Sequence, residues 1–129
     1  MSGALLDTSV LIAGNASGAL ALPETAAISV ITLGELRAGV RLAPDESVAE
    51  MRQRALAAVR RAFAPLPVDE HVAERYGEVL AFARSNRRTA KASDLLIIAT
   101  AAATARRLYT LDPAQARLAD DAGFAATLL

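Results

Sequence analysis

The sequence predicts an α/β fold, a three-layer α/β/α sandwich with a mostly parallel central sheet. Short, almost entirely apolar segments alternate along the chain with longer segments of helical periodicity. Apolar strands of this kind are typical of parallel sheets that helices cover on both faces. The 129 residues contain no repeat or linker, and a chain of this length usually forms one domain. We therefore expect residues 1–129 to form a single domain.

Each expected strand is a short apolar run. The first is Ala4 to Leu6, and the others end near Ile28, around Leu66, at Leu108 to Leu111 and at Phe124 to Leu129. Strong helix formers with helical spacing predict helices at Val30 to Leu42, Asp45 to Phe63, Asp69 to Arg84 and Ser93 to Arg107. Close to the start of the chain, the small residues from Gly14 to Gly18 predict a loop.

The composition narrows the classes of function. There is no cysteine, which excludes disulfides, thiolate metal sites and thiol nucleophiles and fits a reducing cytosol. Lys plus Arg and Asp plus Glu both number 14, so any nucleic-acid binding must be local. Aromatic residues make up only 4%, too few for base-stacking platforms. No signal segment or apolar run of roughly 20 residues is apparent, so we expect a cytoplasmic protein.

Four carboxylates are expected at the carboxyl end of the predicted sheet. Asp7 and Asp112 directly follow strands, whereas Glu35 and Asp94 lie early in helices. Ligands of parallel sheets bind beyond the carboxyl ends of the strands, so these acids could reach one cleft. Crowded carboxylates repel one another unless a cation compensates them. With no cysteine and only His71 as a histidine, the chemistry favours Mg²⁺ over zinc.

Each acid also has a purely structural interpretation. Asp7 and Asp112 could be N-caps, and Asp94 would be stabilised by the helix dipole in a first turn. Glu35 has capping-box spacing from Thr32, although the serine three residues before Thr32 is an equally good helix start. For each acid taken alone both interpretations stay open, and only the whole set favours a shared site.

The residues around the acids form four runs in a definite order. They are Leu5–Ile12, Ile28–Leu36, Ser93–Ala101 and Leu108–Asp112. These runs resemble the motifs of the PIN-domain family, and within it those of VapC-type toxins, over nearly the whole chain. The resemblance departs from the family after the fourth run. Relatives often carry another acid and an aromatic there, where this sequence has Gln115 and Ala116, so Asp112 is the least supported of the four acids.

The resemblance implies a magnesium-dependent endoribonuclease, the toxin of a toxin–antitoxin pair, that hydrolyses RNA with a metal-activated water. Manganese is an alternative ion, and the number of ions stays open. Asp7 and Asp94 are implied as metal ligands, with Glu35 and Asp112 holding waters or orienting the nucleophile. VapC-type toxins pair as homodimers and build a groove for a VapB antitoxin with helices in this part of the chain. The predicted helix Asp45 to Phe63 corresponds to that part here. A VapB-type partner and a homodimer or hetero-oligomer are therefore expected.

Further residues are candidates for substrate binding. Thr8, Ser9 and Thr110 lie beside acids and could bond the metal ligands or the scissile phosphate, or merely satisfy local backbone donors. Arg88 and Lys91 belong to a basic run before the third motif. We expect them to contact the RNA backbone, while a solvated loop is the alternative.

Two other folds with acidic sites fit less well. A signalling receiver domain needs adjacent acids after its first strand and a lysine after a late strand, but Thr8 follows Asp7 and Lys91 precedes a helix. A haloacid-dehalogenase-like phosphatase needs an aspartate where Ser9 stands. The remaining alternative keeps the fold: a PIN-domain RNA-processing nuclease, or an RNA-binding domain, without an antitoxin partner.

Overall fold

The computed structural model describes residues 3–17 and 25–129. Each pair of successive strands is connected by one or two helices. The strands are β1 (Ala4–Leu6), β2 (Ala26–Ser29), β3 (Ala64–Leu66), β4 (Arg107–Thr110) and β5 (Ala126–Leu128). The helices are α1 (Thr8–Ser17), α2 (Val30–Arg41), α3 (Glu46–Ala62), α4 (Glu70–Ser85), α5 (Ala92–Ala103) and α6 (Pro113–Asp121).

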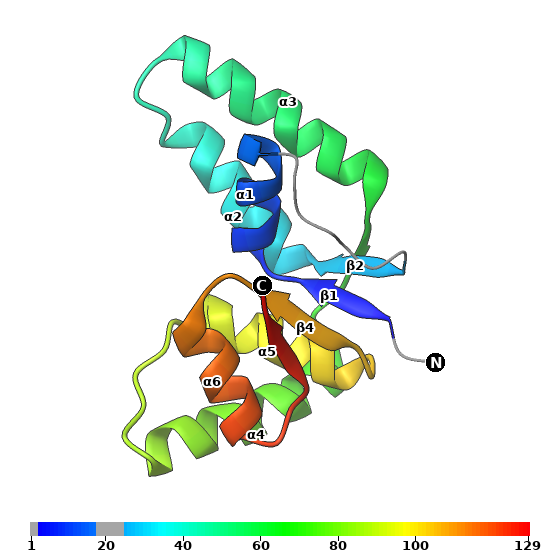
Figure 1. Ribbon diagram of the computed structural model, residues 1–129, viewed down its shortest axis with the longest axis vertical. Coiled ribbons are helices and arrows are strands. Elements are labelled where there is room, and N and C mark those ends of the chain that lie inside the picture. The colour runs from blue at the N-terminus through cyan, green and yellow to red at the C-terminus, as the bar shows by residue number, and fades with distance from the viewer. Residues whose placement is uncertain (1–2, 18–24) are drawn as a thin grey trace.

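The strands form one five-stranded sheet in the order β3-β2-β1-β4-β5. All the pairings are parallel. Figure 1 shows α1, α2 and α3 on one side of the sheet and α4, α5 and α6 on the other. The predicted three-layer α/β/α sandwich is therefore confirmed. Strand β1 lies in the middle and pairs with β4, so Leu5 is opposite Leu108 although about a hundred residues separate them.

The core has two parts, one on each face of the sheet. Successive residues of a strand point to opposite faces, and β1 shows this directly. Leu5 packs with Leu108 and with residues of α4, α5 and α6, whereas Leu6 packs with residues of α1 and α3. Both leucines are fully buried. A strand that is apolar on both faces therefore explains why the short apolar runs predicted a covered parallel sheet.

Three of the predicted helix starts are explained by side-chain caps. Ser29 accepts a hydrogen bond from the backbone N–H of Ile31 at 3.0 Å, which begins α2. Asp45 and Asp69 cap α3 and α4 in the same way, with acceptor distances of 2.9 and 3.0 Å. Such caps satisfy backbone donors that a helix start leaves unpaired.

The prediction of a loop from Gly14 to Gly18 is wrong as far as Ser17, because α1 extends through that residue. Gly18 lies outside the described residues. Glycine disfavours a helix by about 1 kcal/mol relative to alanine. In α1 this cost is offset by tertiary packing, because Val10 and Leu11 are buried in the core.

The predicted helix from Ser93 to Arg107 is too long at its carboxyl end. Helix α5 ends at Ala103, and Arg107 already begins β4. The chain reverses at Ala105, which has a left-handed φ of 54°, and the N–H of Arg106 bonds the carbonyl of Ala101 at 2.8 Å. This is a Schellman ending. Because the left-handed residue is alanine instead of glycine, the sequence carries no stop signal there.

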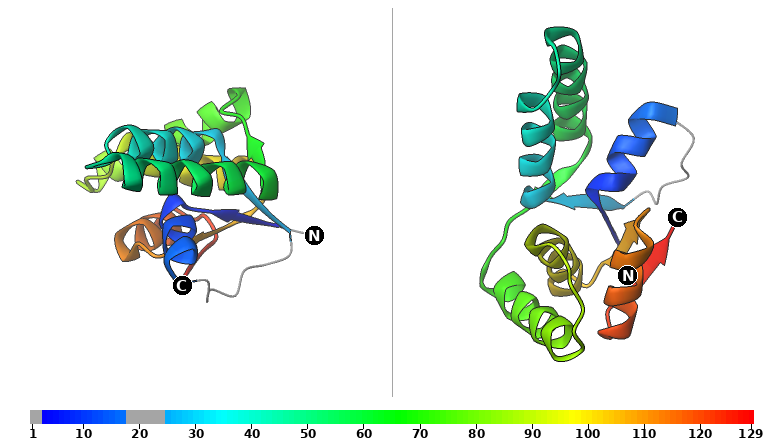
Figure 2. Two further views of the ribbon diagram at one scale, coloured as in Figure 1. Left: turned by 90° about the horizontal axis from the view of Figure 1, so that it is seen from above. Right: turned by 90° about the vertical axis from the view of Figure 1, so that its left-hand side faces the viewer.

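Helix α3 is the longest of the described helices, with 17 residues. It buries Leu56 and Val59, while Met51 on the same helix is 56% exposed. The expected core-facing pattern therefore holds only for its second half. Figures 1 and 2 show α2 and α3 side by side, extending beyond the sheet. No helix of the described residues is long and apolar enough to cross a membrane.

Candidate active site

The strand order creates a crevice at the carboxyl end of the sheet. The strand that follows β1 in the chain lies on one side of it, whereas the strand that follows β4 lies on the other side. Between β1 and β4 the connections therefore diverge, and parallel α/β sheets bind ligands at such a point. Asp7 directly follows β1, and Asp112 lies two residues after β4. The topology places both acids at this crevice, as predicted.

Asp7 is buried and held on several sides. It is 5% exposed. Its Oδ2 accepts the backbone N–H of Ser9 at 3.0 Å, and its Oδ1 accepts the side-chain amide of Gln115 at 3.2 Å. The Thr110 hydroxyl lies 3.4 Å from Oδ2. The bond to Ser9 agrees with the capping interpretation, but the contacts with β4 and α6 reach far beyond the start of α1.

Glu35 reaches this end of the sheet from α2. The Thr8 hydroxyl donates to its Oε1 at 2.6 Å and lies 3.1 Å from the hydroxyl of Thr32. Thr32 is fully buried, so this pair fixes the first turn of α2 against the start of α1. The capping-box interpretation of Glu35 is wrong, because Ser29 is the residue that caps α2. Glu35 is instead fixed next to the residue that follows Asp7.

Asp94 lies in the first turn of α5 and is half-buried. Burial is the first cause that raises its pKa from 3.8 to about 6, and the negative charge of Asp7 is the second. Lys91 lowers this pKa, while Asp112 and Glu35 raise it further. Charges act on one another appreciably only over short distances in solvent. The four predicted acids therefore share one region, although they come from four different elements.

Asp112 has the structural role that the sequence left open. It is the N-cap of α6, and its Oδ1 accepts from the backbone N–H groups of Ala114 at 3.0 Å and Gln115 at 3.4 Å. Pro113 occupies the first turn, as expected after such a cap. Because Asp112 also acts on the pKa of Asp94, the capping role does not remove it from the site.

Gln115 and Thr110 form the buried centre of this end of the sheet. Gln115 is 3% exposed and Thr110 is fully buried. The Thr110 hydroxyl donates to Gln115 Oε1 at 2.7 Å and accepts the backbone N–H of Asp112 at 3.0 Å. Sequence reasoning noted Gln115 only as a departure from the family pattern. Its position three residues after a capping aspartate indicates a residue of the first turn, and only the fold reveals its contact with Asp7.

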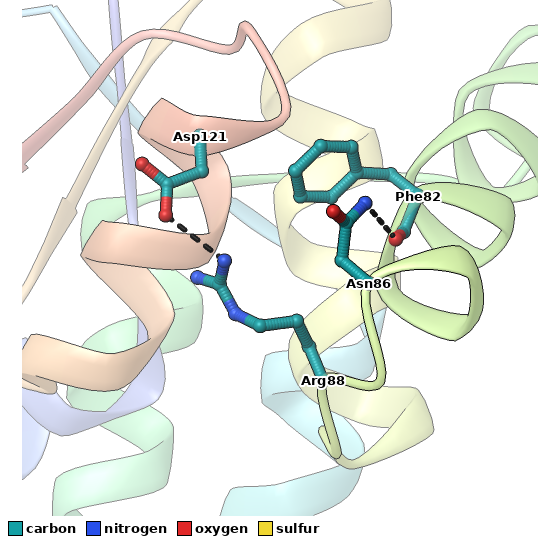
Figure 3. Close-up of polar contacts among 4 residues, drawn as sticks. All are labelled: Phe82, Asn86, Arg88 and Asp121. Carbon is teal, nitrogen blue, oxygen red and sulfur yellow. Dashed lines mark hydrogen bonds and ion pairs between the residues drawn. The ribbon is translucent and has the colours of Figure 1, made fainter.

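A pocket of about 340 Å³ opens beside the acids. Asp94, Asp112 and Gln115 line it together with Arg87, Arg88, Thr89, Ala90, Ala114, Arg117 and Leu118. Figure 3 shows the ion pair between Arg88 and Asp121 of α6, at 2.9 Å. It also shows the side-chain amide of Asn86, which donates to the backbone carbonyl of Phe82 at the end of α4. Arg117 was not predicted, since an arginine on an exposed helix face carries no sequence signal. Lys91 is exposed at the start of α5.

The acids do not form a ready-made metal cage. Within residues 3–17 and 25–129, no group of three or more His, Cys, Asp or Glu side chains is arranged to hold a metal ion. The lone His71 is exposed on α4. The acids influence the pKa of Asp94, but they do not surround a common point. Any bound cation would therefore complete its coordination with water or substrate oxygens.

A parallel sheet that helices cover on both faces, with acids at its switch point, defines the class of α/β domains that bind ligands there. Comparison with known proteins identifies the particular family. The PIN domain family matches residues 4–121. The chain belongs to the PIN domain family.

Its similar relatives carry VapC names. Ribonuclease VapC8 of Mycobacterium tuberculosis is 44% identical over 100 residues, which are 75% of this chain and 88% of the relative. Ribonuclease VapC5 of the same species is 33% identical over 111 residues, covering 84% of this chain and 82% of the relative. These identities place the similarity within the VapC-type ribonucleases of the family.

Solved structures agree. VapBC-5 of M. tuberculosis, a member of the VapBC family of toxin–antitoxin systems, matches with a TM-score of 0.83 and 32% identity over 100% of this chain and 98% of the other. FitAcB of Neisseria gonorrhoeae matches with a TM-score of 0.76 and 29% identity over 95% and 94% of the two chains. The fold of this chain is therefore that of the toxin–antitoxin PIN domains.

Proposed function

We propose that this protein is a metal-dependent endoribonuclease that acts as the toxin of a toxin–antitoxin pair. The observation that carries the proposal is the convergence of four acids, since the charges of Asp7, Glu35 and Asp112 all raise the pKa of the half-buried Asp94. The names of the relatives support the reaction, since the two VapC proteins similar to this chain are ribonucleases.

The donor set fits a hard divalent cation. All four acids offer carboxylate oxygens, and their mutual repulsion would be relieved by a positive charge at the crevice. Mg²⁺ usually binds one or two protein carboxylates and keeps several waters, so it does not need the three-residue cage that is absent from the described residues. Mn²⁺ has the same preference for oxygen. When bound, such an ion would lower the pKa of a water and neutralise charge on phosphorus.

The roles of the protein residues follow from their contacts. Asp7 and Asp94, which both lie within hydrogen-bond reach of Gln115 Nε2, are the proposed metal ligands. Thr8 fixes the Glu35 carboxylate through its 2.6 Å hydrogen bond, which suits a residue that orients water. The substrate-binding roles predicted for Thr8 and Thr110 stay predictions, because their hydroxyls bond protein groups; those bonds support a role in orienting the acids.

The basic side chains beside the pocket support RNA as the substrate. Arg88 and Arg117 line the pocket that also contains Asp94, and Lys91 lies close enough to Asp94 to lower its pKa. Contacts between such cations and phosphates position a nucleic acid without specifying its sequence. An RNA strand bound by these residues would have a phosphate at the acids.

The partner and the assembly are proposed from the relatives. VapBC-5, whose structure matches this chain, is described as a toxin–antitoxin member, and a VapB-type antitoxin is the corresponding partner here. A homodimer and a cytoplasmic location stay predictions. The alternative is a PIN-domain RNA-processing nuclease, or RNA-binding domain, without an antitoxin.

The proposed chemistry is tested by RNA cleavage in Mg²⁺ with Asp94→Asn. We expect a loss larger than the roughly 100-fold that removing an outer-shell metal partner costs. The matched control is Asp69→Asn, because Asp69 caps α4 away from the site and asparagine caps equally well. Full cleavage by Asp94→Asn, or an equal loss in the control, would refute the assignment.

A growth assay separates the toxin from the processing enzyme. Expression of the wild-type chain should arrest growth, expression of Asp7→Ala should not, and co-expression of a short neighbouring reading frame should restore growth. Cleavage in vitro without arrest would favour the processing alternative.

A further inference from the structure

Gln115 belongs to a chain of hydrogen bonds that runs from the backbone N–H of Asp112 to the carboxylate of Asp7. The backbone N–H of Asp112 donates to Thr110 Oγ1 at 3.0 Å, and the Thr110 hydroxyl donates to Gln115 Oε1 at 2.7 Å. Gln115 Nε2 then donates to Asp7 Oδ1 at 3.2 Å and lies 3.5 Å from the backbone carbonyl of Asp94. The chain therefore runs from the cap of α6 to the carboxylate of Asp7.

Each link fixes the orientation of the next. The single hydrogen of the Thr110 hydroxyl has two acceptors within reach, Gln115 Oε1 at 2.7 Å and Asp7 Oδ2 at 3.4 Å, and the shorter contact directs it to Gln115. With Oε1 occupied in this way, the amide N–H₂ of Gln115 is the group that faces Asp7. The opposite orientation of the amide would set its oxygen 3.2 Å from Asp7 Oδ1, with no hydrogen between the two oxygens. The buried amide thus has one satisfactory orientation.

The amide also matters because it is neutral. Gln115 is 3% exposed, and a carboxylate at this position would add a buried negative charge 3.2 Å from Asp7. Like charges at that distance in a poorly solvated site would force protonation or require more cation charge. A glutamine instead donates a hydrogen bond to Asp7 and adds no charge to the site.

We propose that Gln115 is a positioning residue, which holds the Asp7 carboxylate in place for a divalent cation by donating Nε2–H to Oδ1 while Thr110 fixes the amide through Oε1. This inference rests on the proposed function, since it assumes that Asp7 binds the metal. Gln115 acts through Asp7 and need not touch the ion or the RNA.

The test measures Mn²⁺ binding to the whole protein by calorimetry, with Gln115→Met as the variant. Methionine is similar in length and fills the same space but donates no hydrogen bond. We expect the Mn²⁺ affinity to fall by about 10- to 100-fold, the range for loss of an outer-shell partner of a metal ligand. The matched control is Gln53→Met, because Gln53 is an exposed glutamine on α3 and its variant should bind as the wild type does.

A double-mutant cycle distinguishes positioning from general packing. Thr110→Val keeps the shape of the side chain but removes the hydroxyl that orients Gln115. If the two residues act through one chain, the losses in Mn²⁺ affinity of the single variants will not add in the double variant. Additive losses, or an unchanged affinity with a lowered melting temperature, would overturn the proposal. If Gln115→Met does not fold, an unchanged affinity in Thr110→Val overturns it equally.

Two further results separate this inference from the proposed function. If the wild type binds no Mn²⁺, or if Asp7→Asn binds it as tightly as the wild type, the metal assignment fails and the inference fails with it. If the wild type binds Mn²⁺, Asp7→Asn does not, and Gln115→Met retains full affinity, only the role of Gln115 is overturned.

Discussion

The two ends of the sheet use polar side chains in opposite ways. At the carboxyl end, side chains bond mainly to one another, and all the buried polar side chains of the described residues except Thr100 lie there. At the amino end, arginines bond to the backbone: Arg106 reaches the carbonyl of Ala4 at 3.2 Å, and Arg107 reaches that of Ala126 at 3.0 Å. One end therefore carries fixed, charged side chains, and the other uses its charges to hold strands together.

Pocket size does not distinguish these ends. The amino end has a pocket of about 390 Å³ lined by Arg75, Arg106 and Arg107 among others, slightly larger than the pocket of about 340 Å³ beside the acids. What differs is the use of the charged groups. The carboxyl end keeps several negative charges close together, whereas the charges of the amino end bond the backbone. We therefore expect substitutions at the two ends to affect different properties.

The largest effect on stability is expected at the amino end. Arg106→Met removes a charged donor from the carbonyls of Ala4 and Thr25, and hydrogen bonds to charged groups contribute about 1.5–3 kcal/mol each. We expect a loss near the lower figure in urea unfolding, with RNA cleavage unchanged. Arg60→Met, at an exposed position of α3, is the control. A loss of cleavage without a loss of stability would show that Arg106 serves the site and not the fold.

The next effect concerns the pH dependence of stability. The pKa of Asp94 is raised from 3.8 to about 6 in the folded protein, so folding favours the protonated form. Its contribution to stability is therefore complete below pH 3.8 and is lost as the pH rises through about 6. In metal-free buffer Asp94→Asn should be more stable than the wild type at pH 7.5, and this gain should shrink towards pH 4.

Urea unfolding in a chelator at several pH values measures this difference, with Asp69→Asn as the control. Mn²⁺ should reverse the order at pH 7.5, because it stabilises only the chain that retains its carboxylate. A gain for Asp94→Asn that is the same at every pH would show that folding does not raise the pKa of Asp94.

The smallest effect is expected in RNA binding. In an Asp94→Asn background, which prevents cleavage, Arg117→Ala should lower the slope of log affinity against log salt by about 0.7, the value for one phosphate contact to a single strand. Arg75→Ala, at the pocket of the amino end, should leave the slope unchanged. Equal changes in both variants would mean that RNA binds without preference for the acidic end.

Much of the fold could be predicted from the sequence because its signals are local. The strands are short runs that are apolar on both faces, and Ser29, Asp45 and Asp69 mark helix starts with their own side chains. The acids were also predictable, because parallel strands bring their carboxyl ends to one edge whatever the order of the strands. The choice of Asp7 and Asp94 as metal ligands stays a prediction.

What could not be predicted depends on contacts between distant segments or on unusual backbone. Nothing near Gln115 indicates that its amide meets Asp7, which is 108 residues away. The left-handed residues that end α4 and α5, Arg87 and Ala105, have φ values of 55° and 54°. Glycine is the usual residue there, and among the described residues with a left-handed φ only Gly123, at the end of α6, is a glycine.

The adjacency of β1 and β4 has a consequence for the timing of synthesis. Asp7 is made early, but the strand β4 beside β1 and the hydrogen-bond partners Thr110 and Gln115 are made about a hundred residues later. A growing chain that still lacks β4 and α6 cannot assemble the acidic crevice. The crevice can therefore form only after residues 107–121 have been made.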